Sequence, residues 1–494
     1  MKNLISLLEN LEYTLLGNES LLLQNVEDIA YSSHEAAPGK AFFCLIGAKA
    51  DGHNFASDAL KKGARIFFCQ RKLNLPPYTL QVIVKNSRAA LAKVSASFFS
   101  HPERKLAIIG VTGTKGKSTV CEMISHIFSC AGKKCAAIGT LGMKIDGQTE
   151  ATENSTPESY IIYKFLARAV EKGAHIAVME VSSQALCTHR VDGLHFAAAV
   201  FTNLSRDHIG TYEHPDFEHY KAAKKALFSK TDMAFINNDD LFGAEFARAC
   251  LCPVQTYGTG FADIRAVNIS SAQNTGSFGV SFSCTSGGEK AKFSLPQPGE
   301  FSALNALAAS AVCRHFGVTL GECARALSGV NIRGRFEPVA CARGDITCII
   351  DYAHNAVSLE KAIETLREYT AGRIICVFGS VGGRTKERRR ELAEVAARLA
   401  DICVVTSDNP DFEEPAAIIE EIAAYIPAEK CFTEPDRAKA IAAALDLAES
   451  GDLLLFAGKG HEEYQLVRGK KLPFSERELI ENHIFKKQTL IPLP

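Results

Sequence analysis

The sequence predicts an α/β protein made of three consecutive blocks, and three observations lead to this prediction. The chain has 494 residues, which is too many for one hydrophobic core. Apolar runs alternate with helical stretches in the two later blocks, and strands that alternate with helices form parallel sheets. Several of these runs end in turns rich in glycine and polar residues. We place the blocks at residues 1–103, 104–332 and 333–494.

The composition is that of a globular enzyme, with 47% hydrophobic and 22% charged residues. The 55 basic and 56 acidic residues nearly balance, which argues against a broad nucleic-acid-binding surface. The 16 cysteines form no CxxC pair, so we interpret them as small apolar residues of a reducing compartment and expect no zinc site from their spacing. No convincing signal peptide and no run of about 20 apolar residues is present. We therefore expect a cytoplasmic protein without membrane insertion.

The first block has short strand-like runs at 40–47, 64–70 and 80–85, and then a helical stretch around Phe98. A polar joint, "SHPERK" at 100–105, separates it from the second block. The later blocks follow a regular order. In the second block we predict strands at 106–111, 135–139, 175–181, 197–202 and 233–237, helices near 117–131, 158–172, 215–229 and 301–316, and an irregular β stretch at 254–295. In the third we predict strands at 346–351, 373–378, 402–406 and 452–457, and helices at 355–369, 386–400, 415–425 and 435–449.

The stretch "GVTGTKGKSTVCEM" (110–123) is typical of a phosphate-binding loop between a strand and a helix. It matches the end of the GxxxxGK[ST] pattern, although Val111 stands where the first glycine is usual. Glycines let backbone N–H groups face phosphate, and the helix start adds its positive end. Lys117 would neutralise β/γ-phosphate charge, and Ser118 could bind Mg²⁺.

Acidic and histidine residues follow two other predicted strands of the second block. Glu180 ends the strand in "HIAVMEVSSQAL", and Asp207 and His208 follow the strand in "AVFTNLSRDH". Ligands of open α/β sheets bind beyond the carboxyl ends of the strands. Ser118, Glu180 and His208 are therefore our candidate magnesium ligands.

Thirteen motifs in this order resemble the Mur ligase family, most closely its MurE type. They are "PGKAFFCLIGAKADGHNFASDAL", "GVTGTKGKST", "STPES", "EVSSQAL…HR", "FTNLSRDH", "AAKKALF", "NNDD", "GEFSALNALAA", "GRFE", "DYAH", "VFGSVGGR", "TSDNPD" and "GKGHEEYQ". The resemblance implies three domains: an N-terminal UDP-substrate-binding domain, a central P-loop ATP-binding domain with a parallel sheet, and a C-terminal Rossmann-like domain that binds the amino acid.

The activity implied by this resemblance is ATP-dependent amide ligation in peptidoglycan precursor synthesis. ATP would convert the D-Glu γ-carboxylate of UDP-N-acetylmuramoyl-L-Ala-D-Glu into an acyl phosphate, which the amine of a diamino acid then attacks. The enzyme mainly positions the reactants and neutralises charge. The implied partners are UDP-N-acetylmuramoyl dipeptide, ATP, a diamino acid and two Mg²⁺ ions, and we expect a monomer.

The resemblance also assigns roles to single residues. Catalytic roles fall to Lys117, Glu180, His208 and Lys224, with Lys224 carbamylated and holding a second Mg²⁺. ATP would contact Gly113, Thr114, Lys115, Gly116, Lys117, Ser118, Thr119, Asn305, Arg335 and Asp351. Ser33 matches a uridine contact, and the muramyl dipeptide would contact Ser155, Thr156, Ser182 and Arg190. The incoming amino acid would contact Arg389, Asn409, Asp411, Gly458 and Glu462.

The identity of the amino acid depends on one position. MurE enzymes that use meso-diaminopimelate typically carry D-N-P-R, whose arginine pairs with the distal carboxylate, but here the fourth residue is Asp411. An aspartate repels a carboxylate, and Asp411 or Glu413 could attract an ammonium group. We therefore favour L-lysine and keep meso-diaminopimelate as the alternative, with Arg384 or Arg388 then binding its carboxylate.

The chain departs from the family pattern at "SSH" (32–34), Lys115, Ser302 and Val381, and none of these positions removes a catalytic group. The rival interpretations are a folylpolyglutamate synthetase, an inactive scaffold with this fold, and a P-loop motor or kinase. The N-terminal segment at 38–55 and "DNPD" argue against the first. The presence of Lys117, Glu180, His208 and Lys224 argues against the second, and the C-terminal motifs argue against the third.

Overall fold

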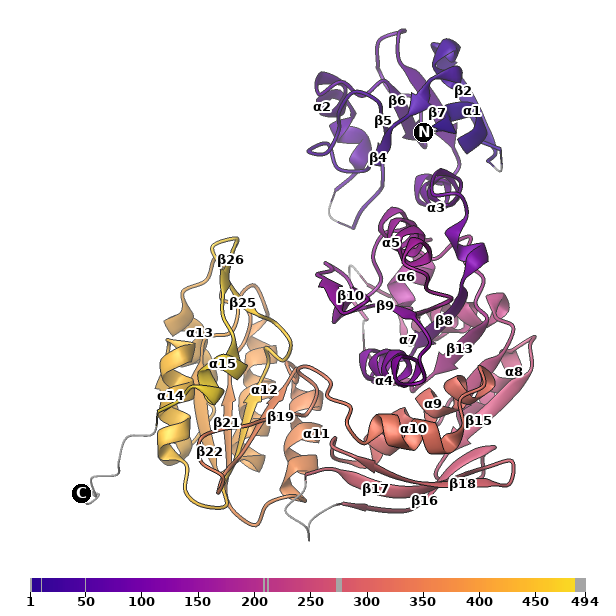
Figure 1. Cartoon of the computed structure of the whole chain (residues 1–494). Coiled ribbons are helices and arrows are strands. Elements are labelled where there is room, and N and C mark those ends of the chain that lie inside the picture. The colour runs from indigo at the N-terminus through magenta and orange to yellow at the C-terminus, as the bar shows by residue number, and fades with distance from the viewer. Residues whose placement is uncertain are drawn as a thin grey trace. The chain divides into compact units, whose positions relative to one another are not determined.

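The computed structural model describes residues 2–9, 11–48, 50–207, 209–210, 213–271 and 278–484 (Figure 1). The chain forms two compact units. The first comprises Met1–Ala266, Cys284–Ala291 and Leu304–Ala326, and the second comprises Val267–Ser283, Lys292–Ala303 and Leu327–Pro494. Within the described residues, no helix is both long enough and apolar enough to cross a bilayer.

The N-terminal part of the first unit is a five-stranded sheet in the order β2-β7-β6-β5-β4. Its strands are β2 (Tyr13–Gly17), β4 (Asp28–Ala30), β5 (Lys40–Phe43), β6 (Ile66–Cys69) and β7 (Leu80–Val84), and only β2 pairs antiparallel. Residues 41–43 of β5 and all of β6 are apolar and buried because the sheet is covered on both faces. The covering helices are α1 (Leu4–Leu7), α2 (Ala56–Lys61) and α3 (Ser87–Phe98), while β1 (Lys2–Asn3) and β3 (Asn25–Val26) form a separate pair.

A second sheet has eleven strands in the order β11-β10-β9-β12-β8-β13-β14-β15-β16-β17-β18. The parallel strands at its centre are β8 (Ala107–Thr112), β9 (Cys135–Gly139), β12 (Ile176–Glu180), β13 (Ala198–Phe201), β14 (Ala234–Asn237) and β15 (Val254–Gly258). The remaining strands are β10 (Gly142–Ile145), β11 (Gln148–Glu150), β16 (Ile264–Ser271), β17 (Val280–Ser286) and β18 (Glu289–Leu295). Strand β8 lies between β12 and β13, so the residues that follow these three strands meet at one edge.

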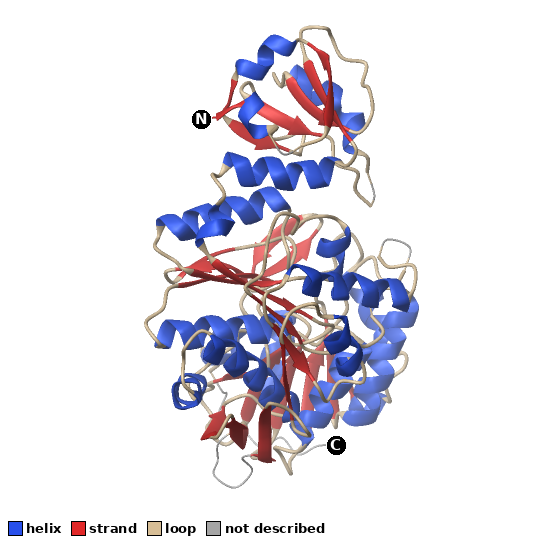
Figure 2. Cartoon of the chain, turned by 90° about the vertical axis from the view of Figure 1, so that its right-hand side faces the viewer, coloured by secondary structure: helices blue, strands red, loops and turns tan. Residues whose placement is uncertain are grey.

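Helices accompany these strands, as Figure 2 shows for the whole chain. They are α4 (Lys117–Cys130), α5 (Ser159–Glu171), α6 (Ser183–Cys187), α7 (Phe217–Lys225), α8 (Gly243–Ala249), α9 (Glu300–His315) and α10 (Leu320–Leu327). Asp216 precedes helix α7 as its N-cap, and its carboxylate accepts the His219 N–H at 2.8 Å.

The second unit contains a six-stranded sheet in the order β19-β20-β24-β21-β22-β23. Its strands are β19 (Glu337–Val339), β20 (Thr347–Asp351), β21 (Ile374–Phe378), β22 (Ile402–Thr406), β23 (Cys431–Glu434) and β24 (Leu453–Ala457). One core lies between the sheet and α11 (Ala356–Arg367), α12 (Lys386–Leu399) and α13 (Pro415–Ala423). The other lies under α14 (Arg437–Leu447) and α15 (Glu476–Glu481), and β25 (Tyr464–Val467) and β26 (Lys470–Pro473) form a hairpin.

The strands and helices predicted from apolar runs are confirmed within a few residues. The prediction missed antiparallel strands, among them β10, β11 and β19. Strand β11 is the exposed tripeptide "QTE", and β19 contains a proline, so neither has the apolar run used to find buried strands. The sheets are therefore mixed, with parallel strands at the centre.

Candidate functional site

The loop between β8 and α4 has the backbone shape that its glycines permit. Gly113 and Gly116 have φ values of +150° and +84°. A Cβ at Gly113 would lie 1.9 Å from Thr202 Oγ1, and one at Gly116 would lie 2.7 Å from Asn305 Oδ1. Both glycines are thus required by positive φ and by close neighbours. Asn305, a predicted ATP residue on α9, lies directly beside the loop.

Two residues after β13 hold this loop, and the sequence prediction did not assign them a role. Thr114 N–H donates to Asn203 O at 2.8 Å, and Lys115 N–H donates to Asn203 Oδ1 at 2.9 Å. Thr202 Oγ1 donates to Lys115 O at 2.7 Å. Their position after the strand beside β8, within the quoted "FTNLSRDH", was the signal that could have identified them.

Two lysines converge on one carbonyl of the loop. Lys117 Nζ donates to Gly113 O and Thr114 O, both at 2.9 Å, and Lys224 Nζ donates to Gly113 O at 2.8 Å. Lys224 is 1% exposed and lies 4.6 Å from the centre of the Tyr220 ring. The pKa of Lys224 is lowered well below its ordinary value, mainly because the side chain is buried and also because Lys117 is a nearby positive charge.

The neighbouring Lys221 and Lys225 have different surroundings. Lys221 pairs with Glu218 at 2.9 Å and with Glu245 at 3.2 Å, and Lys225 also pairs with Glu245. Lys224 is the member of this helical cluster that enters the phosphate-loop region.

A hydroxyl and a carboxylate meet at the start of α4. Ser118 Oγ donates to Glu180 Oε1 at 2.8 Å, and Thr140 N–H donates to the same oxygen at 2.7 Å. A Cβ at Gly139 would lie 2.5 Å from Glu180 Oε1, so the glycine leaves space there. Hard oxygen donors of this kind suit Mg²⁺, and Ser118 and Glu180 fit the predicted role. His208, the third predicted ligand, lies outside the described residues.

The predicted muramyl-dipeptide residues are brought together around Thr156. Thr156 Oγ1 donates to Glu180 O at 2.8 Å and accepts Ser182 N–H at 3.0 Å, and Arg190 donates to Thr156 O at 3.0 Å. Arg190 also pairs with Glu158 at 3.1 Å, and burial lowers the pKa of Arg190. Ser155 is partly buried one position before this cluster.

Ser33 lies in the loop after β4. Two residues earlier, the ring of Tyr31 lies 6.2 Å from that of Tyr160 in α5, and Tyr160 Oη donates to Asp28 Oδ1 at 2.5 Å. These contacts place the loop that carries Ser33 beside the start of α5, close in sequence to Ser155 and Thr156.

In the second unit, Arg335 and Asp351 are neighbours. Asp351 ends β20, and its Oδ2 accepts Phe336 N–H at 2.9 Å. Burial raises the pKa of Asp351, while the positive charge of Arg335 opposes the rise. The Arg335 guanidinium lies 4.9 Å from the centre of the Tyr352 ring.

Asn409 and Glu462 surround a buried lysine that the sequence prediction did not single out. Lys459 is 0% exposed, and its Nζ donates to Asn409 Oδ1 at 2.9 Å, Glu462 Oε2 at 3.1 Å and Asp408 Oδ1 at 3.4 Å. Asn409 Nδ2 donates to Glu462 Oε2 at 2.8 Å. Gly458 has φ +109°, and a Cβ there would lie 3.0 Å from Asp408 Oδ2. The motif "GKGHEEYQ" contained the signal, because Lys459 lies between two predicted site residues.

The acids expected to attract a lysine substrate have other partners. Asp411 has φ +53°, and its Oδ1 accepts Gly469 N–H at 2.7 Å in the turn of the β25–β26 hairpin. Glu413 Oε2 accepts Gly383 N–H at 2.6 Å and pairs with Arg389 at 2.7 Å. Both carboxylates therefore already bind protein N–H groups through one oxygen, Oδ1 of Asp411 and Oε2 of Glu413.

Arg389 is 2% exposed and is held between two carboxylates. Its other guanidinium nitrogen donates to Glu421 Oε2 at 2.7 Å. These hydrogen bonds outweigh the effect of burial and raise the pKa of Arg389. Arg388 donates to His354 O at 3.0 Å, and Arg384 is exposed.

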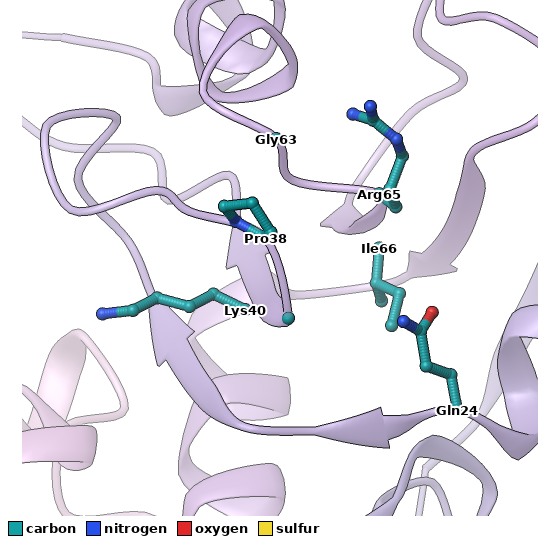
Figure 3. A pocket seen from close by; sticks show the side chains of 7 residues that line it. Gln24, Pro38, Lys40, Gly63, Arg65 and Ile66 are labelled. Atoms are coloured by element: carbon teal, nitrogen blue, oxygen red, sulfur yellow. The ribbon is translucent and has the colours of Figure 1, made fainter.

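A depression of about 190 Å³ in the N-terminal part contains none of the predicted site residues. It is lined by Gln24, Pro38, Gly39, Lys40, Gly63, Arg65 and Ile66 (Figure 3). Lys40 and Ile66 begin the parallel strands β5 and β6, so this hollow lies at the amino ends of the strands. Ser33 instead follows the carboxyl end of β4, the edge at which α/β sheets commonly bind ligands.

Comparison with known proteins covers nearly the whole chain. Residues 25–108, 111–313 and 334–460 match the models described as Mur ligase family catalytic domain, Mur ligase middle domain and Mur ligase glutamate ligase domain. The UDP-N-acetylmuramoyl-L-alanyl-D-glutamate–2,6-diaminopimelate ligase of Caldanaerobacter subterraneus subsp. tengcongensis is 38% identical over 482 residues, 97% of this chain and 98% of that protein. The protein of the same name from Clostridium perfringens is 36% identical, over 96% of this chain and 98% of that one.

A solved structure of an enzyme with this name superposes with a TM-score of 0.65 and 25% identity, over 92% of this chain and 93% of the other. The relatives match the chain from end to end, in agreement with the order of its motifs. The chain belongs to the Mur ligase family of ATP-dependent ligases, and within that family to the MurE type.

Proposed function

We propose that this enzyme joins a diamino acid to the D-Glu γ-carboxylate of UDP-N-acetylmuramoyl-L-Ala-D-Glu at the expense of ATP. The observation that carries the proposal is the convergence of Lys117 and Lys224 on Gly113 O, in a chain whose relatives carry this activity in their names. The Lys117 ammonium group at a glycine-rich helix start suits a polyanionic nucleotide, and the buried Lys224 amine beside it suits the proposed carbamylation. We further propose that residues 1–103, 104–332 and 333–494 are the UDP-substrate, ATP and amino-acid domains.

In the first step, a γ-carboxylate oxygen of D-Glu attacks the γ-phosphorus of ATP, and ADP leaves. In the second step, the amine attacks the acyl-phosphate carbonyl, phosphate leaves, and the amine loses a proton. Lys117 and the N–H groups of the loop would neutralise the transferring phosphate, with Asn305 beside adenine. Arg335 and Asp351 would contact phosphate and ribose. The residues that would orient the dipeptide are Ser155, Thr156, Ser182 and Arg190. Ser33 would contact uridine.

Magnesium would be held by Ser118 and Glu180, together with His208, and would supply charge neutralisation to the phosphates when bound. Lys224 would supply a further carboxylate. Its buried amine, with a pKa well below the ordinary value, is suited to attack CO₂. The nitrogen–carbon bond forms, one proton leaves, and the resulting carbamate carries one negative charge.

For the amino acid we propose meso-diaminopimelate in place of the L-lysine expected from the sequence. The relatives are named as 2,6-diaminopimelate ligases, and the carboxylates of Asp411 and Glu413 are engaged by the protein. Arg389, Asn409, Gly458 and Glu462 would contact the substrate, and the carboxylates of Glu413 and Glu421 hold the Arg389 guanidinium in place. Arg384 would bind the distal carboxylate. Its side chain is exposed, and it lies two residues after Gly382, whose N–H donates to Asn409 O at 2.9 Å.

The test is product formation with ATP and UDP-N-acetylmuramoyl-L-Ala-D-Glu, and separately with ATP and a folate substrate. The first reaction contains a diamino acid as the amine, and the second contains the amine that a folate ligase uses. Mass spectrometry identifies the product of each. A tripeptide product from the muramyl substrate is expected, whereas turnover with folate alone would refute the proposal. Values of kcat/KM for meso-diaminopimelate, L-lysine and L-ornithine then identify the amino acid.

Two variants localise the specificity. Arg384→Ala should lower kcat/KM for meso-diaminopimelate by about tenfold or more while changing the value for L-lysine little, since a charge-assisted hydrogen bond contributes about 1.5–3 kcal/mol. Arg390→Ala is the matched control, because Arg390 is also exposed and pairs with Glu394. A preference of the unmodified enzyme for L-lysine would restore the first expectation, and Asp411→Arg should then shift it toward diaminopimelate.

A further inference from the structure

We propose that Cys187, His214 and His219 form a binding site for a divalent late transition-metal ion such as Zn²⁺. Their ligand atoms all lie within 4.8 Å of one another. They come from three neighbouring segments: Cys187 ends α6, His214 lies in the preceding loop of α7, and His219 lies in the first turn of α7. None of the three belongs to the ATP, magnesium or substrate residues considered above.

The two histidines already face each other across a short gap. His214 Nδ1 and His219 Nδ1 are 2.8 Å apart and share a hydrogen bond. In tetrahedral zinc sites, bond lengths of about 2.0 Å to nitrogen and about 2.3 Å to sulfur imply ligand separations of roughly 3.3–3.6 Å. Small movements of the exposed Cys187 and His219 side chains would therefore complete the geometry, whereas the buried His214 can stay in place.

A second contact fixes the ring of His214. Its Nε2 lies 2.8 Å from Ser183 Oγ, and the ring packs 5.2 Å from that of Tyr220. Both His214 and Ser183 are almost fully buried. Metal-binding histidines commonly use their second nitrogen in this way, since the hydrogen bond orients the ring and sets its tautomer. With Nε2–H donating to Ser183 Oγ, Nδ1 of His214 presents its lone pair to the shared gap.

The protons balance in a simple manner. His219 moves its ring proton from Nδ1 to Nε2, and its Nδ1 lone pair then faces the ion. Cys187 releases its thiol proton to solvent and binds as thiolate. One proton leaves for each ion bound, and the three protein ligands leave the fourth tetrahedral position for water.

The donor set selects the class of ion. Two imidazole nitrogens and one thiolate suit Zn²⁺, Co²⁺ and related ions, whereas Mg²⁺ prefers oxygen ligands. The site is thus chemically distinct from Ser118 and Glu180. A bound ion would link α6, which starts after Ser182, to α7, which carries Lys224 near its end. Binding to the folded state alone would also raise the unfolding temperature.

The experiment is a titration of the full chain with Co²⁺ followed by absorption spectroscopy. We expect visible bands of tetrahedral Co²⁺ and a near-ultraviolet band from thiolate-to-cobalt charge transfer, at one ion per chain, and displacement of both by Zn²⁺. Cys187→Ser should abolish the charge-transfer band, and His219→Ala should weaken binding at least tenfold.

The chain supplies a matched control in Cys130. Among the described residues, Cys130 and Cys187 are the exposed cysteines, and Cys130 Sγ lies 3.6 Å from His126 Nε2 but has no second histidine in its cluster. Cys130→Ser should therefore leave the spectrum unchanged. A charge-transfer band that survives in Cys187→Ser, or its absence in the unmodified protein, would refute the site. Thermal unfolding with and without Zn²⁺ provides a second measurement, and only the unmodified and Cys130→Ser proteins should be stabilised.

Discussion

Two buried lysines, one in each unit, have opposite surroundings. Lys224 in the first unit donates to the backbone oxygen of Gly113, and within the described parts of the chain no carboxylate forms an ion pair with it. Lys459 in the second unit donates to the carboxylates of Glu462 and Asp408 and to the amide of Asn409. The first lysine is therefore pushed toward its neutral form, while the charge of the second is balanced by the protein.

This difference separates a reactive group from a positioning group. A buried amine that easily loses its proton can become a nucleophile, as the proposed carbamylation of Lys224 requires. A lysine held by three acceptors instead fixes the orientation of the residues around it. By this reasoning Lys459 is a positioning residue for Asn409 and Glu462, the proposed contacts of the incoming amino acid.

The largest expected effect is on catalysis through Lys224. Lys224→Ala should lower kcat by about a hundredfold or more, because removal of one preorganised charge near the transferring phosphoryl group has effects of this size. A short-chain carboxylate such as formate, added to the variant, should restore part of the activity. Steady-state rates measure both effects.

Lys221→Ala is the matched control, since this lysine belongs to the same helix but pairs with Glu218 and Glu245. Full activity in Lys224→Ala would contradict the proposed catalytic role of Lys224. The distinction between a reactive Lys224 and a positioning Lys459 would then fail.

The next effect is on stability in the second unit. Lys459→Met should destabilise the fold by about 3–5 kcal/mol, because it leaves the carboxylates of Asp408 and Glu462 without their buried cation. Denaturant titration would measure the loss, and KM for the diamino acid should rise while KM for ATP stays nearly constant. Lys470→Met, at an exposed position in β26, should change neither. Equal rises in both KM values would argue against a positioning role.

The third prediction concerns the effect of the lowered Lys224 pKa on how stability depends on pH. Its folded-state pKa is lowered, so below the ordinary pKa of 10.5 the unfolded chain binds a proton that the native chain does not. This group therefore makes stability rise with pH between the lowered pKa and 10.5. Lys224→Met should be more stable than the unmodified protein at neutral pH, and its curve should be flatter over that window. The measurement is the denaturant midpoint of both proteins from pH 7 to pH 10. Parallel curves for the unmodified protein and Lys224→Met would contradict the prediction, because they would mean that burial does not affect this amine.

The smallest effect is expected at Asp411. Asp411→Ala removes the acceptor of Gly469 N–H at an accessible turn and should cost about 1 kcal/mol. Asp411→Asn keeps an acceptor oxygen and tolerates a positive φ, so it should lose less. Thermal unfolding compares the two, and equal losses would show that the hydrogen bond contributes little.

Much of this architecture could be predicted because buried strands have continuous apolar sequences. The strand 402–406 was predicted to the residue, and the helix predicted near 117–131 is Lys117–Cys130 in the structure. The phosphate loop followed from Gly113, Gly116 and Lys117, since few other sequences permit this turn.

What the sequence could not show was pairing over long separations. The contact of Lys224 with Gly113 spans 111 positions, and that of Lys459 with Asn409 spans 50. Asp411 is another example, because its carboxylate accepts the N–H of Gly469, 58 residues away in the sequence. The same limitation hid Cys187, His214 and His219, which meet only after α6 and α7 pack together.

The attachment of the β25–β26 hairpin to Asp411 also affects how this enzyme can evolve. Asp411 N–H donates to Leu466 O, its carbonyl accepts Arg468 N–H, and its side chain accepts Gly469 N–H, so a single residue anchors the turn by three hydrogen bonds. A mutation of Asp411 to arginine, the residue that the resemblance implies here in enzymes that use meso-diaminopimelate, would remove the side-chain anchor. Its benefit would then depend on the residues already present at 468 and 469. Substitutions at position 411 are therefore expected to be coupled to substitutions at 468 and 469, and their order would decide whether each intermediate keeps the hairpin anchored.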